Sequence, residues 1–206
     1  MICVVGGHSR NIGKTTVAAS LIAATPEARW TAIKLTQHGH GFCTHGLTEC
    51  ACSAHPGPYD ILLQNEPNET DSGRFLSAGS ERAYWVRSAQ GRLAEAMPAL
   101  RQLIAESPNT IIESNSILQF LRPDLYLVVV DFSNLDMKDS TRLFIDRADA
   151  FIQTGPHTVP AAPQWPGVSP RWFHRKPILA PGSPELIALL HSRLNAAATP
   201  APGPSS

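Results

Sequence analysis

Short apolar runs alternate along the chain with segments whose apolar residues recur three or four positions apart. The runs are rich in β-branched side chains, as expected for strands buried on both faces of a sheet; they cover residues 2–5, 29–35, 82–87, 110–112, 125–130, 150–153 and 177–179. The helical spacing predicts helices over residues 14–24, 71–78, 92–106, 138–147 and 184–194, the third bent or split at Pro98. Strands that alternate with helices in this way predict an α/β protein with a doubly wound, mostly parallel sheet in a three-layer α/β/α arrangement.

Three segments lack a regular period. Residues 37–59 contain many Gly, His and Cys, and we expect a long loop of the kind that carries function. Residues 159–170 form a proline-rich connection, and the Ala, Pro and Ser of residues 196–206 predict a disordered tail. With 206 residues the chain suits one hydrophobic core, so we expect a single domain over residues 1–195.

The charge and hydropathy of the chain argue against some classes of partner. The chain has 17 Lys and Arg residues and 17 Asp and Glu residues, so its formal net charge is zero. This gives no electrostatic case for binding nucleic acid or an anionic membrane. No run approaches the roughly 20 apolar residues of a membrane span, and the N-terminus lacks the basic start and long apolar stretch of a signal peptide. We therefore expect a cytoplasmic protein, in which the four cysteines stay reduced.

The clearest chemical signal lies between the first strand and the first helix, where a glycine-rich segment ends in Gly-Lys-Thr. Backbone N–H groups of such a loop can surround a phosphate chain, and the helix N-terminus adds partial positive charge. Lys14 should reach the β- and γ-phosphates of a nucleoside triphosphate, Thr15 should ligate Mg²⁺, and Thr16 should reach the α-phosphate. Five residues separate the two glycines, where four are common. The residues of this phosphate-binding loop are Gly7, His8, Ser9, Arg10, Asn11, Ile12, Gly13, Lys14, Thr15 and Thr16.

A second part of this chemistry is an acidic residue at the end of a strand. Glu113 follows the run 110–112, and P-loop folds place such a carboxylate beside the phosphates, where it holds Mg²⁺ through water. Asp131 follows the run 125–130 and is a rival for this role. The alternative is that Glu113 is a surface acid that happens to end a strand. The sequence alone does not decide between the two carboxylates; with Glu113 preferred, Lys14 and Glu113 are the predicted catalytic residues.

These residues make the chain resemble the molybdopterin-guanine dinucleotide biosynthesis adapter (MobB) family, a P-loop NTPase family of the branch that includes dethiobiotin synthetase. The similarity covers roughly residues 2–155 and rests on four places: Gly13-Lys14-Thr15-Thr16; Ala32-Ile33-Lys34 with His38-Gly39-His40; Asp71-Ser72-Gly73-Arg74 with Ala78-Gly79; and Ile111-Ile112-Glu113. The resemblance implies a GTP·Mg²⁺-binding adapter with slow hydrolysis that acts in molybdenum-cofactor biosynthesis. It also implies a molybdopterin-type ligand or a partner enzyme, and it leaves the oligomeric state open, a homodimer included.

Other features differ from that family and keep an alternative open. The glycine spacing of the phosphate-binding loop is more like that of dethiobiotin synthetase, which favours an ATP-dependent ligase or kinase. Ser114-Asn115-Ser116 stands where the adapters usually have a glycine, and no Asn-Lys-x-Asp motif for guanine follows the run 150–153. The sequence therefore does not decide between GTP and ATP. Ser9 stands where the ParA-type ATPases of this branch carry a lysine, and Arg10 is the nearest cation.

Cysteine and histidine gather in the long loop and are candidate metal ligands. Thiolates and imidazoles suit Zn²⁺, and three cysteines with one histidine are a common closed set. The irregular spacing equally fits a polar loop with reduced thiols. If a metal binds, a third function is open, namely a metal-handling module gated by nucleotide. The candidate Zn²⁺ ligands are Cys43, Cys50, Cys52 and His55, and His38 or His40 is a candidate for contact with a phosphate.

Asp71 and Arg74 lie three residues apart, so one face of a helix can present both to a ligand. A guanidinium binds phosphate in bidentate fashion, and Arg74 is therefore predicted to bind an anionic second ligand such as a pterin phosphate. Asp71 would orient Arg74 or join the Mg²⁺ shell through water. The alternative is structural: Asp71 caps the helix N-terminus and Arg74 forms an ion pair on the surface.

Overall fold

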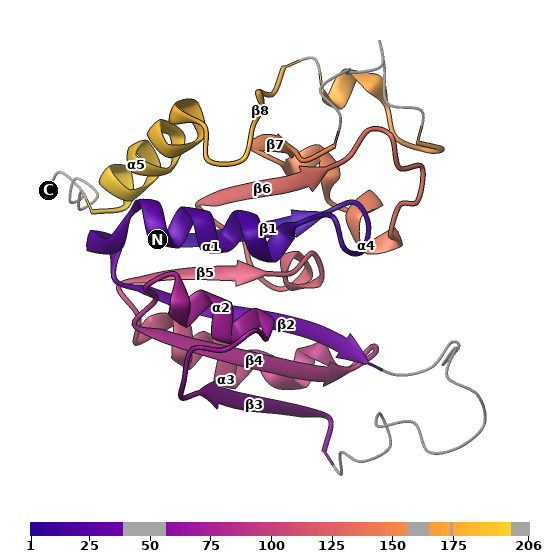
Figure 1. Cartoon of the computed structure of the whole chain (residues 1–206). Coiled ribbons are helices and arrows are strands. Elements are labelled where there is room, and N and C mark those ends of the chain that lie inside the picture. Colours follow the sequence, from indigo (N-terminus) through magenta and orange to yellow (C-terminus); the bar gives the residue numbers. More distant parts are fainter. Residues whose placement is uncertain (39–56, 156–164, 174, 199–206) are drawn as a thin grey trace, which may run out of the picture.

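The computed structural model describes residues 1–38, 57–155, 165–173 and 175–198 (Figure 1). In this part of the chain the strands are β1 (Ile2–Gly7), β2 (Trp30–His38), β3 (Tyr59–Gln64), β4 (Arg82–Ala89), β5 (Asn109–Glu113), β6 (Leu125–Val130), β7 (Ala150–Gln153) and β8 (Ile178–Leu179). The helices are α1 (Lys14–Ala24), α2 (Asp71–Ser77), α3 (Leu93–Ala105), α4 (Asp139–Arg142) and α5 (Pro184–Ala198), with short 3-10 helices η1 (Pro26–Ala28), η3 (Ser116–Gln119), η4 (Ile145–Arg147) and η5 (Pro170–Trp172). Within the described residues, none of the helices combines the length and the apolar character that spanning a bilayer requires.

The strands form one sheet in the order β3-β4-β2-β5-β1-β6-β7-β8, and every neighbouring pair is parallel except β3 with β4. β1 lies between β5 and β6, and β5 separates it from β2 (Figure 1). The register places Val5, Glu113 and Lys34 in one row across β1, β5 and β2. Because these strands are parallel, their carboxyl ends meet at one edge of the sheet, which is where ligands of such folds bind.

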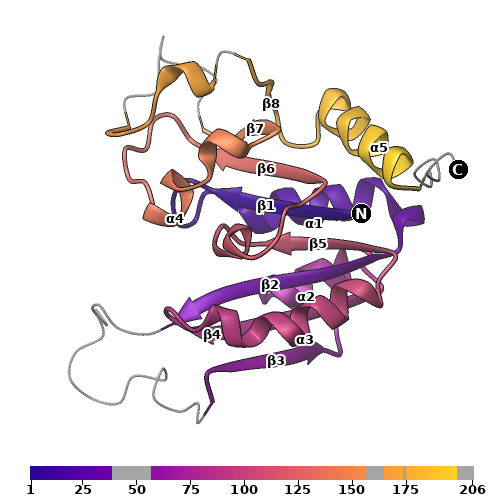
Figure 2. The same cartoon turned by 180° about the vertical axis from the view of Figure 1, so that it is seen from behind.

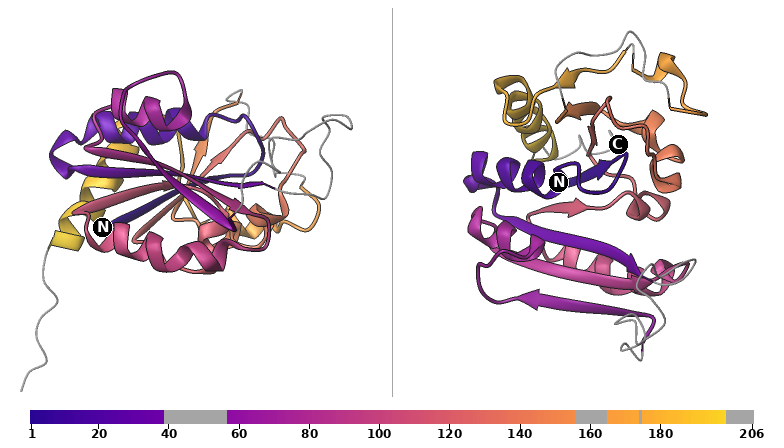
Figure 3. Two further views of the ribbon diagram at one scale, coloured as in Figure 1. Left: turned by 90° about the horizontal axis from the view of Figure 1, so that it is seen from below. Right: turned by 45° about the vertical axis from the view of Figure 1, so that its right-hand side comes forward.

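Helices cover both faces of the sheet and complete the three predicted layers, as the views from behind and from below show (Figures 2 and 3). α1, α2 and α5 pack on one face, where Leu21, Phe75 and Leu186 are fully or almost fully buried. α3 packs on the opposite face around Leu100, and an aromatic group that includes Trp165 continues this core. The apolar side chains of each strand therefore point alternately into two cores, and this fixes the register of the sheet.

The observed elements confirm the predicted fold class, and several have the predicted bounds. α1, β6 and β7 begin and end where the sequence pattern places them. The predicted split at Pro98 is wrong, because α3 is continuous through it. Pro98 and the carbonyl that it leaves unpaired lie on the exposed side of α3, while Leu93, Met97 and Leu100 hold the other side against the sheet.

Three other predicted bounds are wrong. β3 begins at Tyr59, inside the segment that was expected to be a loop, and pairs with β4 at the edge of the sheet. The helix predicted over residues 138–147 is the short α4 followed by η4. α5 continues to Ala198, so residues 196–198 are helical and do not belong to a disordered tail. For β3 the pairing with a distant strand, which local sequence does not encode, decides where the element begins.

Candidate nucleotide-binding site

The phosphate-binding loop leaves β1 at Gly7 and enters α1 at Lys14, as the sequence predicts. Asn11 and Gly13 have positive φ angles of 54° and 86°, and such left-handed positions curl the backbone so that successive N–H groups can face one ligand. Gly13 is the N-cap of α1 and provides no side-chain hydrogen bond to the first turn. The N–H groups at the start of α1 are therefore without a side-chain cap, and a phosphate oxygen can accept from them.

Asn115 fixes the start of this loop, a role that the sequence did not reveal. Its side-chain amide accepts a hydrogen bond from the N–H of Gly7 and donates one to the carbonyl of Gly7, both at 2.9 Å. The hydroxyl of Thr141 donates to the same carbonyl at 2.8 Å. Asn115 thus adds one more pair of hydrogen bonds between the ends of β1 and β5. It lies in the segment Ser114-Asn115-Ser116, where the MobB family usually has a glycine.

Lys14 lies inside the loop, with its ammonium donating to the carbonyl of Ser9 at 2.9 Å. The pKa of Lys14 is lowered from 10.5 to about 8, chiefly by burial and also by repulsion from Lys138 and Lys34, while Glu113 and Asp71 act in the opposite direction. The charged form of Lys14 is therefore poorly solvated where it stands. A phosphate anion in the loop would stabilise that charge, so Lys14 is prepared for an anionic ligand.

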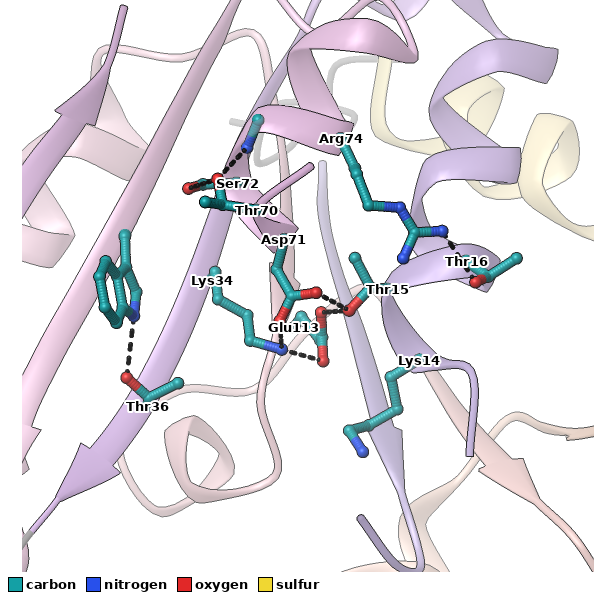
Figure 4. A network of polar contacts seen from close by, with 12 residues as sticks. Lys14, Thr15, Thr16, Lys34, Thr36, Thr70, Asp71, Ser72, Arg74 and Glu113 are labelled. Atoms are coloured by element: carbon teal, nitrogen blue, oxygen red, sulfur yellow. Dashed lines mark hydrogen bonds and ion pairs between the residues drawn. The ribbon is translucent and has the colours of Figure 1, made fainter. Parts of the chain in front are cut away.

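Thr15, Asp71, Lys34 and Glu113 form a closed ring of polar contacts next to the loop (Figure 4). The Thr15 hydroxyl lies 3.0 Å from Oδ1 of Asp71 and 2.7 Å from Oε2 of Glu113. The Lys34 ammonium donates to the other oxygens of the same carboxylates, at 2.8 Å to Asp71 and 2.5 Å to Glu113. Each carboxylate therefore shares one oxygen with Thr15 and one with Lys34.

The hydrogen-bonding capacity of this ring fits a divalent cation. The hydroxyl of Thr15 has one proton, so it can donate to only one of the two carboxylate oxygens that face it. A cation next to the hydroxyl would take its lone pairs and would be attracted by both carboxylates, which can hold it through water. Within the described residues no cluster of three or more His, Cys, Asp or Glu side chains could hold a metal. Mg²⁺ suits so small a set, because it keeps several waters and takes phosphate oxygens as ligands.

The charges in the ring favour the ionised form of Asp71. Burial alone would raise the pKa of Asp71, but hydrogen bonds and attraction from Lys34, together with the hydrogen bond from Thr15, outweigh it and lower the pKa below its usual value. Asp71 is therefore ionised at neutral pH. The side chain of Glu113 is 2% exposed and that of Lys34 is 14% exposed, so this ion pair is shielded from water.

No role was predicted for Lys34, although its place in an otherwise buried strand indicates one. Lys34 is a charged residue inside the strand β2, whose other residues up to that point are buried. Such a lysine needs a buried partner, and the register of β2 with β5 supplies Glu113 directly opposite. The pairing itself could not be read from the sequence, because the two residues lie 79 positions apart.

Asp131, the rival candidate for the magnesium site, lies outside the ring. Its Oδ1 accepts hydrogen bonds from the N–H of Ser133 at 2.9 Å and from the hydroxyl of Ser133 at 2.6 Å. The carboxylate of Asp131 therefore closes a local turn after β6. Of the two acids at strand ends, the structure brings only Glu113 into contact with Thr15.

One expectation for the helix α2 is wrong, namely that Asp71 caps its N-terminus. Arg74 donates to the hydroxyl of Thr16 at 3.0 Å, whereas the side chain of Asp71 points to Thr15 and Lys34 (Figure 4). The N-cap of α2 is Thr70, whose hydroxyl accepts from the N–H of Gly73 at 3.1 Å. Asp71 is therefore free of the capping role and available to the ring.

His8 contributes to the site through its backbone. Its side chain is fully buried, with its ring centroid 4.7 Å from that of Trp165, and burial lowers its pKa. The neutral imidazole thus packs behind the loop. His38 is the last residue of β2. His40 and the proposed Zn²⁺ ligands Cys43, Cys50, Cys52 and His55 lie outside the described residues.

A crevice of about 580 Å³ opens beside the loop and the ring. Four cationic side chains line it, namely Arg10, Lys14, Lys34 and Lys138, and Glu113 is the one acid among its lining residues. Asn115, Ser116 and Gln90 contribute polar groups. Arg74 does not line the crevice. An anionic ligand in the crevice would therefore lie beside the four cations named above and not beside Arg74. The excess of positive charge suits an anion with several charges.

Comparisons with known proteins give little beyond topology. No protein-family model matches the chain, and no curated protein sequence is similar to it. A structure of LpxK from Aquifex aeolicus in complex with ATP is similar over 87% of this chain and 53% of that one, with 17% identity and a TM-score of 0.46. A structure of HypB from Helicobacter pylori in complex with nickel is similar over 97% of this chain and 90% of that one, with 13% identity and a TM-score of 0.47. Neither likeness is close enough to transfer an activity.

The chain's own topology and loop define its class. A central parallel strand runs into a glycine-rich turn, the turn opens α1 with Lys14 and Thr15, and the neighbouring strand places an acid opposite Thr15. This arrangement is that of a P-loop nucleotide-binding protein with an α/β fold.

Proposed function

We propose that this protein binds a nucleoside triphosphate together with Mg²⁺ and acts as a GTP-binding adapter of the MobB kind, with slow hydrolysis. The observation that carries the proposal is the convergence of Asp71 and Glu113 on the hydroxyl of Thr15, at 3.0 and 2.7 Å. The two carboxylates carry one more charge than Lys34 neutralises, so they would still repel a phosphate chain unless a further cation joins them. We therefore interpret the ring as one side of a Mg²⁺ coordination shell, with phosphate oxygens as ligands on the other side.

Each residue has one role in this proposal. The N–H groups of the loop and the ammonium of Lys14 bind the β- and γ-phosphates, and Thr15 provides a direct ligand for Mg²⁺. Glu113 and Asp71 bind the ion through water, while Lys34 holds both carboxylates in place. When bound, Mg²⁺ supplies positive charge next to the phosphoryl oxygens, where negative charge develops during transfer.

Slow hydrolysis follows from the way the acids are held. Both carboxylates beside the phosphates are engaged by Thr15 and by Lys34. These contacts favour the ionised carboxylates, so each is a weaker base toward an attacking water. A protein of this kind would act through its nucleotide-bound state more than through turnover.

The resemblance to the MobB family is supported by the positions of the segments that carry it. Lys34, Asp71 and Glu113 come from three of those segments. Asp71 and Glu113 contact Thr15, which belongs to the fourth segment, and Lys34 contacts both carboxylates. Segments chosen by chance would have no reason to converge. A role in molybdenum-cofactor biosynthesis is the finer part of the proposal, and binding of a molybdopterin-type ligand or of a partner enzyme tests it.

The crevice favours a second candidate, an ATP-dependent kinase or ligase of the dethiobiotin synthetase kind. A volume of about 580 Å³ beside Lys14 and Lys34 exceeds what a phosphate group needs and would admit an anionic acceptor. Comparison of ATP with GTP affinity separates the two candidates. The third candidate, a nucleotide-gated metal module, rests on the Cys/His loop; zinc content of protein purified without chelators tests it.

The central experiment measures nucleotide affinity by calorimetry with Mg²⁺ and with EDTA, for ATP and for GTP. In Glu113→Gln we expect the gain in affinity that Mg²⁺ gives to fall by about tenfold or more, with little change in EDTA. Asp131→Asn is the matched control, because it ends the strand on the other side of β1, and we expect less than about a twofold change. The assignment is wrong if the two variants exchange these results.

A further inference from the structure

A second segment packs along the phosphate-binding loop, and it comes from the turn between β6 and α4. The N–H of Lys138 donates to the carbonyl of His8 at 2.8 Å. The side-chain amide of Asn134 donates to the hydroxyl of Ser9 at 3.1 Å, and the carbonyl of Asn134 accepts from the indole of Trp165 at 2.8 Å. Met137 is buried. This turn is therefore fixed next to the loop at its two ends.

The side chain of Lys138 points to the same crevice as Lys14 and Arg10. It is half-buried, and among the described residues it has no acid within ion-pair distance. Burial lowers the pKa of Lys138, and repulsion by Arg10 and Lys34 adds to this effect beyond what Glu113 and Asp136 offset. A partly desolvated ammonium among other cations is unfavourable unless an anion joins them.

The position of that anion follows from the neighbours of Lys138. The loop amides and Lys14 hold the phosphate chain on one side, and Thr15 with Glu113 marks the magnesium side. The crevice that Lys138 lines also includes Lys14, the lysine that reaches the β- and γ-phosphates in the proposed site, and Glu113 on the magnesium side. If the ammonium of Lys138 contacts the γ-phosphate there, a diphosphate would leave that ammonium without an anionic partner.

We propose that Lys138 is a second phosphate-binding lysine, which contacts the γ-phosphate and makes the site distinguish a nucleoside triphosphate from a diphosphate. This inference rests on the proposed nucleotide binding and adds the means by which the bound state is recognised. It assigns a binding role to a residue outside the phosphate-binding loop. Lys34, which is held by two carboxylates, is not available for that role.

The test compares affinities for a non-hydrolysable triphosphate analogue and for the diphosphate, each with Mg²⁺, in wild type and in Lys138→Met. A charge-assisted hydrogen bond is worth about 1.5–3 kcal/mol, so we expect affinity for the triphosphate to fall by about tenfold or more. Affinity for the diphosphate should change by less than about twofold. Lys138→Arg keeps the charge and should restore part of the preference for triphosphate.

Two further variants make the result specific. Lys176→Met is the matched control, because Lys176 is also a half-buried lysine but bonds to the carbonyl of Asp146, away from the loop. Arg10→Met tests the remaining cationic side chain that lines the crevice. The inference is overturned if Lys138→Met weakens both nucleotides equally, or if Arg10→Met alone abolishes the preference. Failure of wild type to bind the triphosphate analogue would instead overturn the proposed function, and the inference with it.

Discussion

β5 and β6 lie on either side of β1, both contain apolar residues, and an acid stands at the carboxyl end of each. Glu113, the last residue of β5, reaches the hydroxyl of Thr15 at 2.7 Å and is almost fully buried. Asp131 follows β6 directly, and its carboxylate accepts hydrogen bonds from Ser133 in the same turn. The two acids look alike in sequence, and their surroundings give them different roles.

The neighbouring strand explains the difference. On one side of β5 lies β2, which presents Lys34 opposite Glu113 and so holds the longer glutamate side chain toward the loop. The shorter aspartate after β6 meets a serine two residues on, which offers both an N–H and a hydroxyl. Glu113 is part of the site because the neighbouring strand supplies a cation, Lys34. Asp131 stabilises a turn because Ser133, two residues later, supplies hydrogen-bond donors.

The largest effect that bears on this comparison is expected for Lys14→Ala. Lys14 bonds to a loop carbonyl and not to a core residue, so the fold should persist while triphosphate affinity falls by about a hundredfold or more. Combined with Glu113→Gln the loss should be less than the sum of the two single effects, because both act on the same phosphates through one site. Combined with Asp131→Asn the effects should add. Calorimetry on the three single and two double variants would contradict the comparison if both pairs were additive.

The stability of the protein without ligand gives the next effect. Glu113→Ala leaves the mostly buried Lys34 with Asp71 as its remaining partner, so we expect the free energy of unfolding to fall by about 2 kcal/mol. Asp131→Ala removes the acceptor of a turn, and a loss of about 1 kcal/mol is expected. Denaturation with urea measures both. Equal losses would mean that the two acids have similar structural roles after all.

The sequence predicted the frame of this site well, because the frame depends on local signals. The bounds of α1 and the strand that carries Glu113 follow from apolar spacing, and the phosphate-binding loop is a contiguous motif. These features need only a few neighbouring residues to be recognised. The same holds for β6, whose residues are all buried, as its apolar sequence indicates.

The sequence did not predict the contacts that complete the site. Lys34 meets Glu113 through strand register, Asn115 bonds to a glycine 108 positions away, and Lys138 reaches the loop from the turn between β6 and α4. The contact of Arg74 with Thr16 was not predicted either. Spacing along a helix indicates only approximately which residues share a face. The packing of α2 against α1 determines which groups each side chain contacts.

The pH dependence of nucleotide binding is a smaller effect and separates the two acids directly. Only the protonated form of Lys14 attracts phosphate, and its pKa is about 8 without ligand, so affinity should be constant below pH 8 and fall by up to about tenfold per unit above it. Glu113 raises the pKa of Lys14, so Glu113→Gln should move the start of this decline to lower pH. Asp131 has no such effect, and Asp131→Asn should leave the profile in place. Calorimetry between pH 6.5 and pH 9.5 measures the shift, and equal shifts in both variants would contradict the assignment.

The smallest effect is expected for Arg74→Ala, which tests whether α2 contributes to the site through Asp71 alone. Arg74 donates to the exposed hydroxyl of Thr16, and such a contact contributes little to stability, so the free energy of unfolding should change by less than about 0.5 kcal/mol. Thr16 is the residue predicted to reach the α-phosphate, and loss of the guanidinium leaves its hydroxyl in place. Nucleotide affinity should therefore change by less than about twofold, whereas Asp71→Asn, three residues earlier, should weaken Mg²⁺-dependent binding about as Glu113→Gln does. A large loss in Arg74→Ala would show that the cation of α2 acts on the phosphates, and the division of roles between Asp71 and Arg74 drawn from their contacts would be wrong.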